Sequence, residues 1–168
     1  MSAAAELRKS SFAPVADADA RLLILGSLPG ELSLRKGQYY GNPQNQFWGL
    51  VGVALGRDLP EPYEARLAAL QSAGVALWDV VASAVRPGSL DARIRDHQPN
   101  PLADFVATLP RLRAVAFNGK TAAAIGGRAL GGVARLQLMP LPSSSPAYTL
   151  PFARKAEAWA ELRRFLER

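Results

Sequence analysis

The sequence contains no cysteine and only one histidine, His97. The absence of cysteine excludes disulfides, thiolate zinc sites, iron–sulfur clusters and cysteine nucleophiles. With one histidine, a histidine-rich metal site is also excluded, and a Ser-His-Asp triad would have to be built around His97. Because the stretch from Asp96 to Pro99 has the composition of a loop, we interpret His97 as a surface or turn residue.

Long apolar runs are absent as well. No segment approaches the roughly 18 apolar residues that a membrane span requires. The start of the chain carries Glu6, Asp17 and Asp19 among alanines, which is unlike a secretory signal. We therefore expect a cytoplasmic protein that is not attached to a membrane.

The composition that remains is that of a folded, basic protein. The 168 residues fit one domain, which can bury roughly two thirds of its unfolded surface. We place this domain at residues 19–168, after a flexible alanine-rich segment at residues 1–18. Hydrophobic residues make up 49% of the chain, which is too many for a disordered protein. The net charge of +6 favours a polyanionic partner, although a basic enzyme of another kind would share it.

Apolar runs and helical patterns alternate along the chain. Four apolar runs flanked by turn residues predict buried strands at residues 21–27, 75–80, 114–118 and 135–139. Apolar residues at helical spacing predict helices at residues 46–55, 61–73, 101–108, 120–125 and 152–166. This alternation indicates an α/β domain with a largely parallel sheet. Ligands bind beyond the carboxyl ends of such strands, so the segments that follow them are the candidates for chemistry.

The first candidate segment follows the first strand. Residues 26–30 (GSLPG) form a tight turn that can bring backbone N–H groups close to a ligand, although a plain strand-to-loop turn has the same composition. Residues 38–48 (QYYGNPQNQFW) then combine aromatic rings, which stack on a nucleobase, with amides, which pair with its polar edge or hold a water. We interpret Phe47 and Trp48 as core anchors of the next helix. Tyr39, Tyr40, Asn42 and Asn45 are then left for binding.

Two further segments suit a nucleic-acid backbone. Residues 141–148 (LPSSSPAY) hold three hydroxyls in a stiff loop without negative charge, which favours phosphate oxygens as acceptors. Leu141 is a candidate for an apolar wedge in the base stack. Residues 118–121 (NGKT) place Lys120 near a helix start, where it can contact a phosphate, but they lack the spacing of a nucleotide-triphosphate loop.

These segments together resemble the hypoxanthine-DNA glycosylase family of the uracil-DNA glycosylase superfamily. The match rests on residues 26–30, 39–48, 76–80 (ALWDV) and 141–147, in the family's order. It implies a three-layer α/β/α sandwich with a short, mainly parallel four-stranded sheet. It further implies a monomer that flips a deaminated base out of DNA and hydrolyses the N-glycosidic bond. Branches with a four-cysteine iron–sulfur cluster are excluded, so no cofactor or metal is implied.

One position departs from the superfamily pattern. Leu28 stands where mismatch-specific relatives carry a catalytic Asn, and a leucine can neither orient a water nor stabilise charge. The hypoxanthine branch is thought to use an Asn in the following loop. The candidates are Asn42 and Asn45, with a slight preference for Asn42 because Asn45 lies at a helix entry. Uracil excision is less strongly implied than hypoxanthine excision.

The resemblance and the motifs define a set of site residues. We predict Asn42 and Asn45 as catalytic residues that place a water, while N–H groups of the turn stabilise charge on the departing base. The predicted base-binding residues are Gly26, Ser27, Leu28, Tyr40 and Asn118. The predicted DNA-binding residues are Lys120, Leu141, Ser143, Ser144 and Ser145.

Two other functions compete with this hypothesis. A lesion-recognising DNA-binding module with little or no catalysis is favoured by the apolar Leu28. A small-molecule hydrolase that uses one of Ser143 to Ser145 is disfavoured, because the Gly-x-Ser-x-Gly elbow is missing and His97 is the only base. The preference among hypoxanthine, uracil, xanthine and alkylated bases, and between single- and double-stranded DNA, stays open at this stage.

Overall fold

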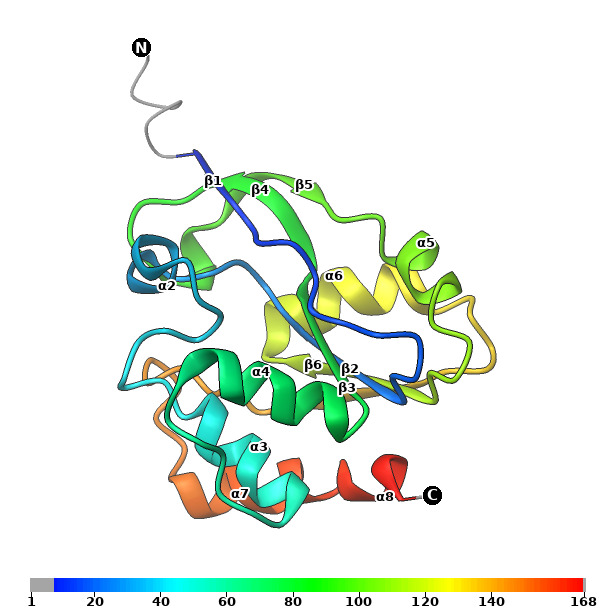
Figure 1. Ribbon diagram of the computed structural model, residues 1–168. Helices are drawn as coiled ribbons and strands as arrows, with labels where there is room; N and C mark the ends of the chain where they lie inside the picture. Colours follow the sequence, from blue (N-terminus) through cyan, green and yellow to red (C-terminus); the bar gives the residue numbers. More distant parts are fainter. Residues whose placement is uncertain (1–7, 168) are drawn as a thin grey trace.

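The computed structural model, which describes residues 8–167, is built around a four-stranded parallel sheet (Figure 1). The central strand β2 (Leu22–Gly26) pairs with β3 (Val75–Asp79) on one side and with β6 (Ala114–Asn118) on the other. β7 (Gln137–Leu141) pairs with the far side of β6 and forms an edge of the sheet. All four strands run in the same direction, so their carboxyl ends meet at one edge of the layer.

Helices cover both faces of this sheet. One face packs against α3 (Phe47–Leu55), α4 (Tyr63–Ser72) and α7 (Phe152–Ala160), with the short α8 (Arg163–Leu166) at the end of the chain. The opposite face packs against α5 (Leu102–Ala107) and α6 (Lys120–Leu130). The predicted three-layer α/β/α sandwich with a four-stranded parallel sheet is therefore confirmed.

Alternate residues of each strand supply the two cores. In β2, Leu22 and Ile24 face the α3–α4–α7 layer, whereas Leu23 and Leu25 face the α5–α6 layer. Every residue of β2, β3 and β6 is buried, as expected of strands covered on both faces. These continuous apolar runs were therefore readable directly from the sequence.

A second sheet lies beside the first and was not predicted. β4 (Val81–Val85) starts two residues after β3 and pairs antiparallel with both β1 (Arg8–Ser10) and β5 (Arg95–Pro99). All five β5 residues are exposed, and each is polar or a proline. The sequence therefore shows no apolar alternation from which this strand could be predicted. His97 belongs to β5 and is exposed, which corrects its assignment to a loop.

The predicted flexible segment of residues 1–18 needs a correction over its second half. Residues 8–10 pair with β4, and Val15 forms an isolated bridge with Leu77 of β3. Residues 8–18 therefore belong to the folded domain. The prediction for residues 1–7 lies outside the described residues.

Three element boundaries differ from the prediction for identifiable reasons. The last strand extends two residues further, through Pro140, because an edge strand tolerates proline. α6 continues past Ile125 because Gly126 packs its bare Cα against the ring of Phe117. The predicted helix at residues 152–166 breaks into α7 and α8.

A short helix between β2 and α3 was missed. α2 (Glu31–Lys36) begins with an acidic first turn and ends with two basic residues and a left-handed Gly37. These are ordinary helix-end signals, but six residues give too little periodicity to detect. None of the helices in residues 8–167 is long and apolar enough to cross a bilayer. The same residues contain no group of three or more His, Asp or Glu side chains that could hold a metal ion.

Candidate active site

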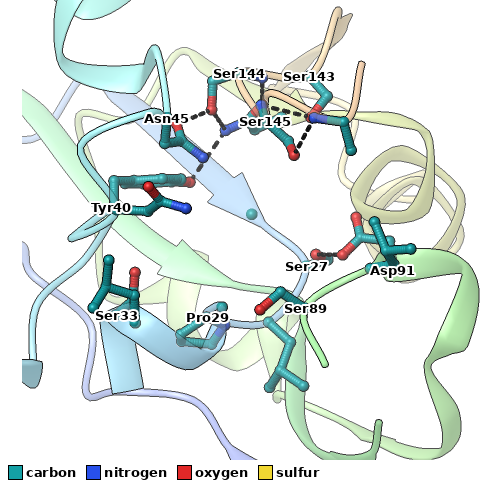
Figure 2. A pocket seen from close by; sticks show the side chains of 18 of the residues that line it. Ser27, Pro29, Ser33, Tyr40, Asn45, Ser89, Asp91, Ser143, Ser144 and Ser145 are labelled. Atoms are coloured by element: carbon teal, nitrogen blue, oxygen red, sulfur yellow. Dashed lines mark hydrogen bonds between the residues drawn. The ribbon is translucent and has the colours of Figure 1, made fainter. Parts of the chain in front are cut away.

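A cavity of about 680 Å³ opens at the carboxyl ends of β2, β3 and β6 (Figure 2). Its walls come from five segments that are far apart in the sequence: the turn after β2, α2, the loop before α3, the loop that contains η1 (Asp91–Arg93), and the loop after β7. Predicted and unpredicted residues both line it, among them Gly26, Ser27, Leu28, Tyr40, Asn42, Asn45, Asp79, Leu90, Asp91, Asn118, Ser143, Ser144 and Ser145. The parallel topology therefore brings most of the predicted site together.

Gly26 lies in close approach to two polar side chains of the cavity lining. It is the last residue of β2 and lies in register with Asp79, the last residue of β3. A Cβ atom on Gly26 would lie 2.6 Å from Asp79 Oδ1 and 2.8 Å from the hydroxyl oxygen of Tyr40. No side chain fits there without displacing these two groups, so glycine is required by the close approach.

Asp79 is a buried carboxyl group in the lining of this cavity. Its side chain is 4% exposed, and its Oδ2 atom has no hydrogen-bond partner among the described residues. Burial raises the pKa of Asp79 to about 7, and the negative charge of Asp91 adds to this, whereas Arg86 opposes it. The carboxyl group therefore holds its proton up to about neutral pH.

Arg86 stabilises the turn after β2 through hydrogen bonds to backbone carbonyl oxygens. This guanidinium is fully buried and donates to the carbonyl oxygens of Pro29 at 2.6 Å, Gly88 at 2.8 Å and Leu28 at 3.3 Å. Burial lowers the pKa of Arg86, and nearby carboxylates, Asp91 first, oppose this shift. The turn is thus fixed by a charged group that does not line the cavity.

On one wall of the cavity, Ser27 and Asp91 form a short pair. The Ser27 hydroxyl donates to Asp91 Oδ1 at 2.6 Å. Burial raises the pKa of Asp91, and the hydrogen bond from Ser27 and the charge of Arg86 both lower it. Figure 2 shows this pair across the cavity from Tyr40 and Asn45. Ser27 therefore holds an acidic residue in place besides lining the cavity.

Tyr40 forms an aromatic wall on the opposite side. Its ring stacks on Phe47 with centroids 3.7 Å apart and planes 11° apart. Its backbone is in the left-handed region, with φ of 52°, which is uncommon for a residue other than glycine. Burial and the charge of Asp79 raise the pKa of Tyr40, so the phenol stays neutral. Phe47 is a core residue as predicted, and it fixes the ring of Tyr40.

A chain of hydrogen bonds joins Tyr40 to the loop after β7. The amide of Asn118 donates to the Ser144 hydroxyl at 2.9 Å and to the Tyr40 hydroxyl at 3.4 Å, while Asn118 Oδ1 accepts from the Ser144 backbone N–H at 2.9 Å. The Ser144 hydroxyl in turn donates to Asn45 Oδ1 at 2.7 Å. Asn118 lines the cavity, but these bonds occupy both ends of its amide.

The two predicted catalytic asparagines both line the cavity, but they differ in what they can still bind. Asn45 Oδ1 accepts from Ser144 and from the Phe47 backbone N–H, which uses both of its lone pairs. Within residues 8–167, Asn42 Oδ1 accepts only from the Gln44 backbone N–H. Asn42 Oδ1 can therefore accept a hydrogen bond from a water molecule, whereas Asn45 can offer a ligand only its Nδ2 donor.

The loop after β7 is tied down by a buried lysine. Lys155 of α7 is buried, and its Nζ donates to Gln46 Oε1 at 2.9 Å and to the Ser145 carbonyl oxygen at 3.2 Å. Burial lowers the pKa of Lys155. Ser143 and Ser145 line the cavity, and their hydroxyl oxygens accept local backbone N–H bonds, so each hydroxyl proton is available to a ligand. Lys155 therefore fixes the loop that presents these hydroxyls.

The structure gives Leu141 and Ser144 other roles than the predicted ones, and it places Lys120 at a helix start as predicted. Leu141 is 6% exposed and packs in the core beneath the α3–α7 layer, so its side chain cannot act as a wedge. Ser144 is 1% exposed and uses its hydroxyl, N–H and carbonyl groups in bonds within the protein. Its predicted phosphate contact is therefore replaced by a structural role. Lys120 is exposed at the start of α6, outside the cavity lining.

Several residues of the site were missed from the sequence. Asp79 is the last residue of β3 and lies within the predicted strand at residues 75–80, and its position near a carboxyl end was the signal for a site residue. Leu90 is a large apolar side chain that lines the cavity and is 52% exposed. Asp91, Arg86 and Lys155 carried no recognisable signal, because their roles depend on contacts between distant segments.

The fold and the site together define a small α/β protein with a polar cavity, walled by an aromatic ring and amides, at the carboxyl ends of its strands. The family model of the uracil DNA glycosylase superfamily matches residues 13–163. The chain is 39% identical over 158 residues to a hypoxanthine DNA glycosylase of Methanosarcina barkeri, covering 92% of this chain and 98% of that protein. A hypoxanthine DNA glycosylase of Methanosarcina acetivorans is 44% identical over 115 residues, covering 68% and 73%.

A solved structure agrees with these matches. The solution NMR structure of a candidate uracil DNA glycosylase from Methanosarcina acetivorans superimposes with a TM-score of 0.86 at 39% identity, covering 96% of this chain and 99% of that chain. The chain therefore belongs to the uracil DNA glycosylase superfamily.

Proposed function

We propose that this protein is a monofunctional DNA glycosylase that flips a deaminated base into the cavity and hydrolyses its N-glycosidic bond in base-excision repair. Hypoxanthine is the first substrate to test, because the two curated relatives are named for it, and uracil and xanthine follow. The observation that carries the proposal is the cavity itself, which combines the Tyr40 ring with the amides of Asn42 and Asn45. An aromatic wall and amides are the groups that bind a flipped base.

DNA is the proposed partner, and its backbone is held by the rim of the cavity. The net charge of +6 attracts the phosphates. Ser143 and Ser145 supply hydroxyl donors at the rim, and Lys120 supplies a more distant positive charge. We also propose that the protein acts in the cytoplasm as a monomer, and we place no cofactor or metal in the reaction.

Hydrolysis in this site relies on positioning rather than on a carboxylate base. Asn42 accepts a hydrogen bond from the attacking water, and Asn45 donates to the substrate through Nδ2. N–H groups of residues 26–30 stabilise negative charge on the departing base. Among the described residues no lysine lines the cavity, which supports hydrolysis without a strand-cleaving lyase step.

Aspartate substitutions should separate the two asparagines. Asn42→Asp keeps an acceptor for the water and should retain base release to within about tenfold of wild type, whereas Asn42→Ala should lose about 100-fold. Asn45→Asp removes the Nδ2 donor and should lose as much as Asn45→Ala, again about 100-fold. The measurement is single-turnover release of hypoxanthine from a duplex with one deoxyinosine.

The control for this experiment is Gln44→Ala, an exposed neighbour that lies outside the cavity lining and should match wild type. Equal losses for Asn42→Asp and Asn42→Ala would refute the water-holding role of Asn42. If the wild-type protein binds the lesion duplex but releases no hypoxanthine, uracil or xanthine, the lesion-binding module, favoured by the apolar Leu28, replaces the glycosylase.

Leu90 is the proposed wedge that fills the stack after the base has left. Leu90→Ala should slow release from duplex DNA by about tenfold, with little effect on single-stranded DNA, which has no paired stack to open. Because Leu90 is exposed, the free energy of unfolding should change by less than about 0.5 kcal/mol. Phe152→Ala removes another exposed apolar side chain, away from the cavity, and serves as the control. Equal slowing on both kinds of DNA would argue against a wedge.

A further inference from the structure

The Asp79 carboxyl group has an unusual environment for an acidic side chain. Its Oδ2 atom is buried without a partner, and no ion pair involves Asp79 among residues 8–167. Arg86 is the nearby cation, but its guanidinium donates to the backbone carbonyl oxygens of Leu28, Pro29 and Gly88 and not to Asp79. A buried carboxylate without compensation is costly, whereas a neutral acid is tolerated.

The groups around Asp79 favour its neutral form. Asp91 faces it from η1 with a negative charge, and Arg86 faces it from the end of β4 with a weaker opposing effect. Tyr39 and Tyr40, from the loop before α3, are phenols whose pKa values are raised by burial and by the charge of Asp79. The pKa of Asp79 is raised to about 7, mainly by burial.

The geometry indicates which oxygen carries the proton. The buried, partnerless Oδ2 is least costly as a carbonyl oxygen, because an O–H there would lack an acceptor. Oδ1 lies beside Gly26 in the cavity lining, 2.6 Å from where a Cβ atom of that glycine would stand, and the Tyr40 hydroxyl oxygen approaches the same point to 2.8 Å. A proton on Oδ1 therefore makes Asp79 a hydrogen-bond donor to a ligand in the cavity.

We propose that Asp79, as a neutral acid, donates a hydrogen bond to the exocyclic carbonyl oxygen of the flipped base and so selects deaminated bases over their amino parents. Deamination replaces an amino group, which only donates, by a carbonyl oxygen, which accepts. An O–H donor at Asp79 matches the carbonyl of hypoxanthine, xanthine or uracil and opposes the amino group of adenine. This inference deepens the proposed glycosylase function and rests on it.

The same donor would also act during bond cleavage. Negative charge builds on the base as the N-glycosidic bond breaks, and part of it resides on the exocyclic oxygen. A hydrogen bond to that oxygen strengthens as the charge develops, so Asp79 stabilises the transition state more than the bound substrate. Ionisation of Asp79 removes the donor and places a negative charge beside the departing base.

The test is single-turnover release of hypoxanthine across pH 5.5 to 9 by wild type, Asp79→Asn and Asp79→Ala. Above pH 7, wild-type release should fall by up to about tenfold per pH unit, because the acid ionises. Asp79→Asn keeps a donor that does not titrate, so it should remain within about fivefold of wild type at pH 6 and lose the alkaline fall. Asp79→Ala should lose at least about tenfold at pH 6.

Two further variants, one expected to shift the pH profile and one control, complete this test. Asp91→Asn removes the neighbouring negative charge and should move the alkaline fall to lower pH. Asp104→Asn removes an exposed carboxylate on α5 and should leave the profile unchanged. An alkaline fall that persists in Asp79→Asn, or a folded Asp79→Ala with wild-type rates, would overturn the inference.

A second readout separates this inference from the proposed function. With ¹³C-labelled aspartate, the carboxyl resonance that disappears in Asp79→Asn reports the titration of Asp79 directly. Its midpoint should rise when a duplex with a non-cleavable 2′-fluoro-deoxyinosine is added and not with the 2′-fluoro-deoxyadenosine duplex. Absence of base release by wild type would refute the glycosylase, whereas a midpoint unmoved by the deoxyinosine duplex would refute the role of Asp79.

Discussion

Gly26→Ala should reduce base release by on the order of 1000-fold while the protein remains folded. The new methyl group would lie 2.6 Å from Asp79 Oδ1 and 2.8 Å from the Tyr40 hydroxyl oxygen, distances at which one of these groups must move. It would also project into the cavity in which we propose that the flipped base binds. Misplacing a substrate by about 1 Å costs about 100-fold, and loss of the Asp79 contact adds about tenfold. Single-turnover release from a deoxyinosine duplex measures the effect.

Gly30→Ala is the matched control for this prediction. Gly30 lines the same cavity four residues further along, but a Cβ there would meet only Ser89, at 3.4 Å. Its φ of −68° suits any residue, so no backbone strain arises. Gly30→Ala should therefore retain activity within about threefold. Comparable losses in both variants would mean that the turn as a whole, and not the close approach of Asp79 and Tyr40 to Gly26, controls the reaction.

The sequence predicted the main sheet well because its strands are buried on both faces. Continuous apolar runs such as Ala114–Asn118 can be recognised in the sequence as buried strands. Because ligands bind beyond the carboxyl ends of parallel strands, the segments that follow these runs are then expected to form one site. The second sheet was not predicted because its edge strand, Arg95–Pro99, has no buried face. Its presence depends on pairing with β4, which is a tertiary effect.

The site was predicted by segment more reliably than by residue. The loop at residues 141–148 does border the cavity, but Leu141 ends a strand and Ser144 turns inward to bond Asn118 and Asn45. A sequence pattern does not show which of three consecutive serines faces the ligand. Asp79 lies in the segment at residues 76–80 that carried the resemblance, but it was not among the predicted site residues, because its missing hydrogen-bond partner is visible only in three dimensions.

Replacement of Arg86 should have the largest effect on stability. Arg86→Met leaves the carbonyl oxygens of Leu28, Pro29 and Gly88 without their charged donor in a buried setting. The free energy of unfolding should fall by about 3 kcal/mol, which corresponds to a decrease in Tm of about 10 °C for a chain of this size. Denaturant unfolding and thermal melts at pH 6 measure both quantities.

The turn that Arg86 supports also forms a wall of the cavity, so this variant should lose activity below its unfolding transition as well. Arg135→Met provides the comparison, because Arg135 donates to the carbonyl oxygens of Leu112, Val106 and Leu109 away from the cavity. Arg135 is exposed, so its loss should lower stability less and leave base release unchanged. If Arg86→Met is destabilised yet releases hypoxanthine at the wild-type rate, the turn of residues 26–30 keeps its shape without Arg86. The N–H groups of that turn would then be positioned by the β2–β3 register alone.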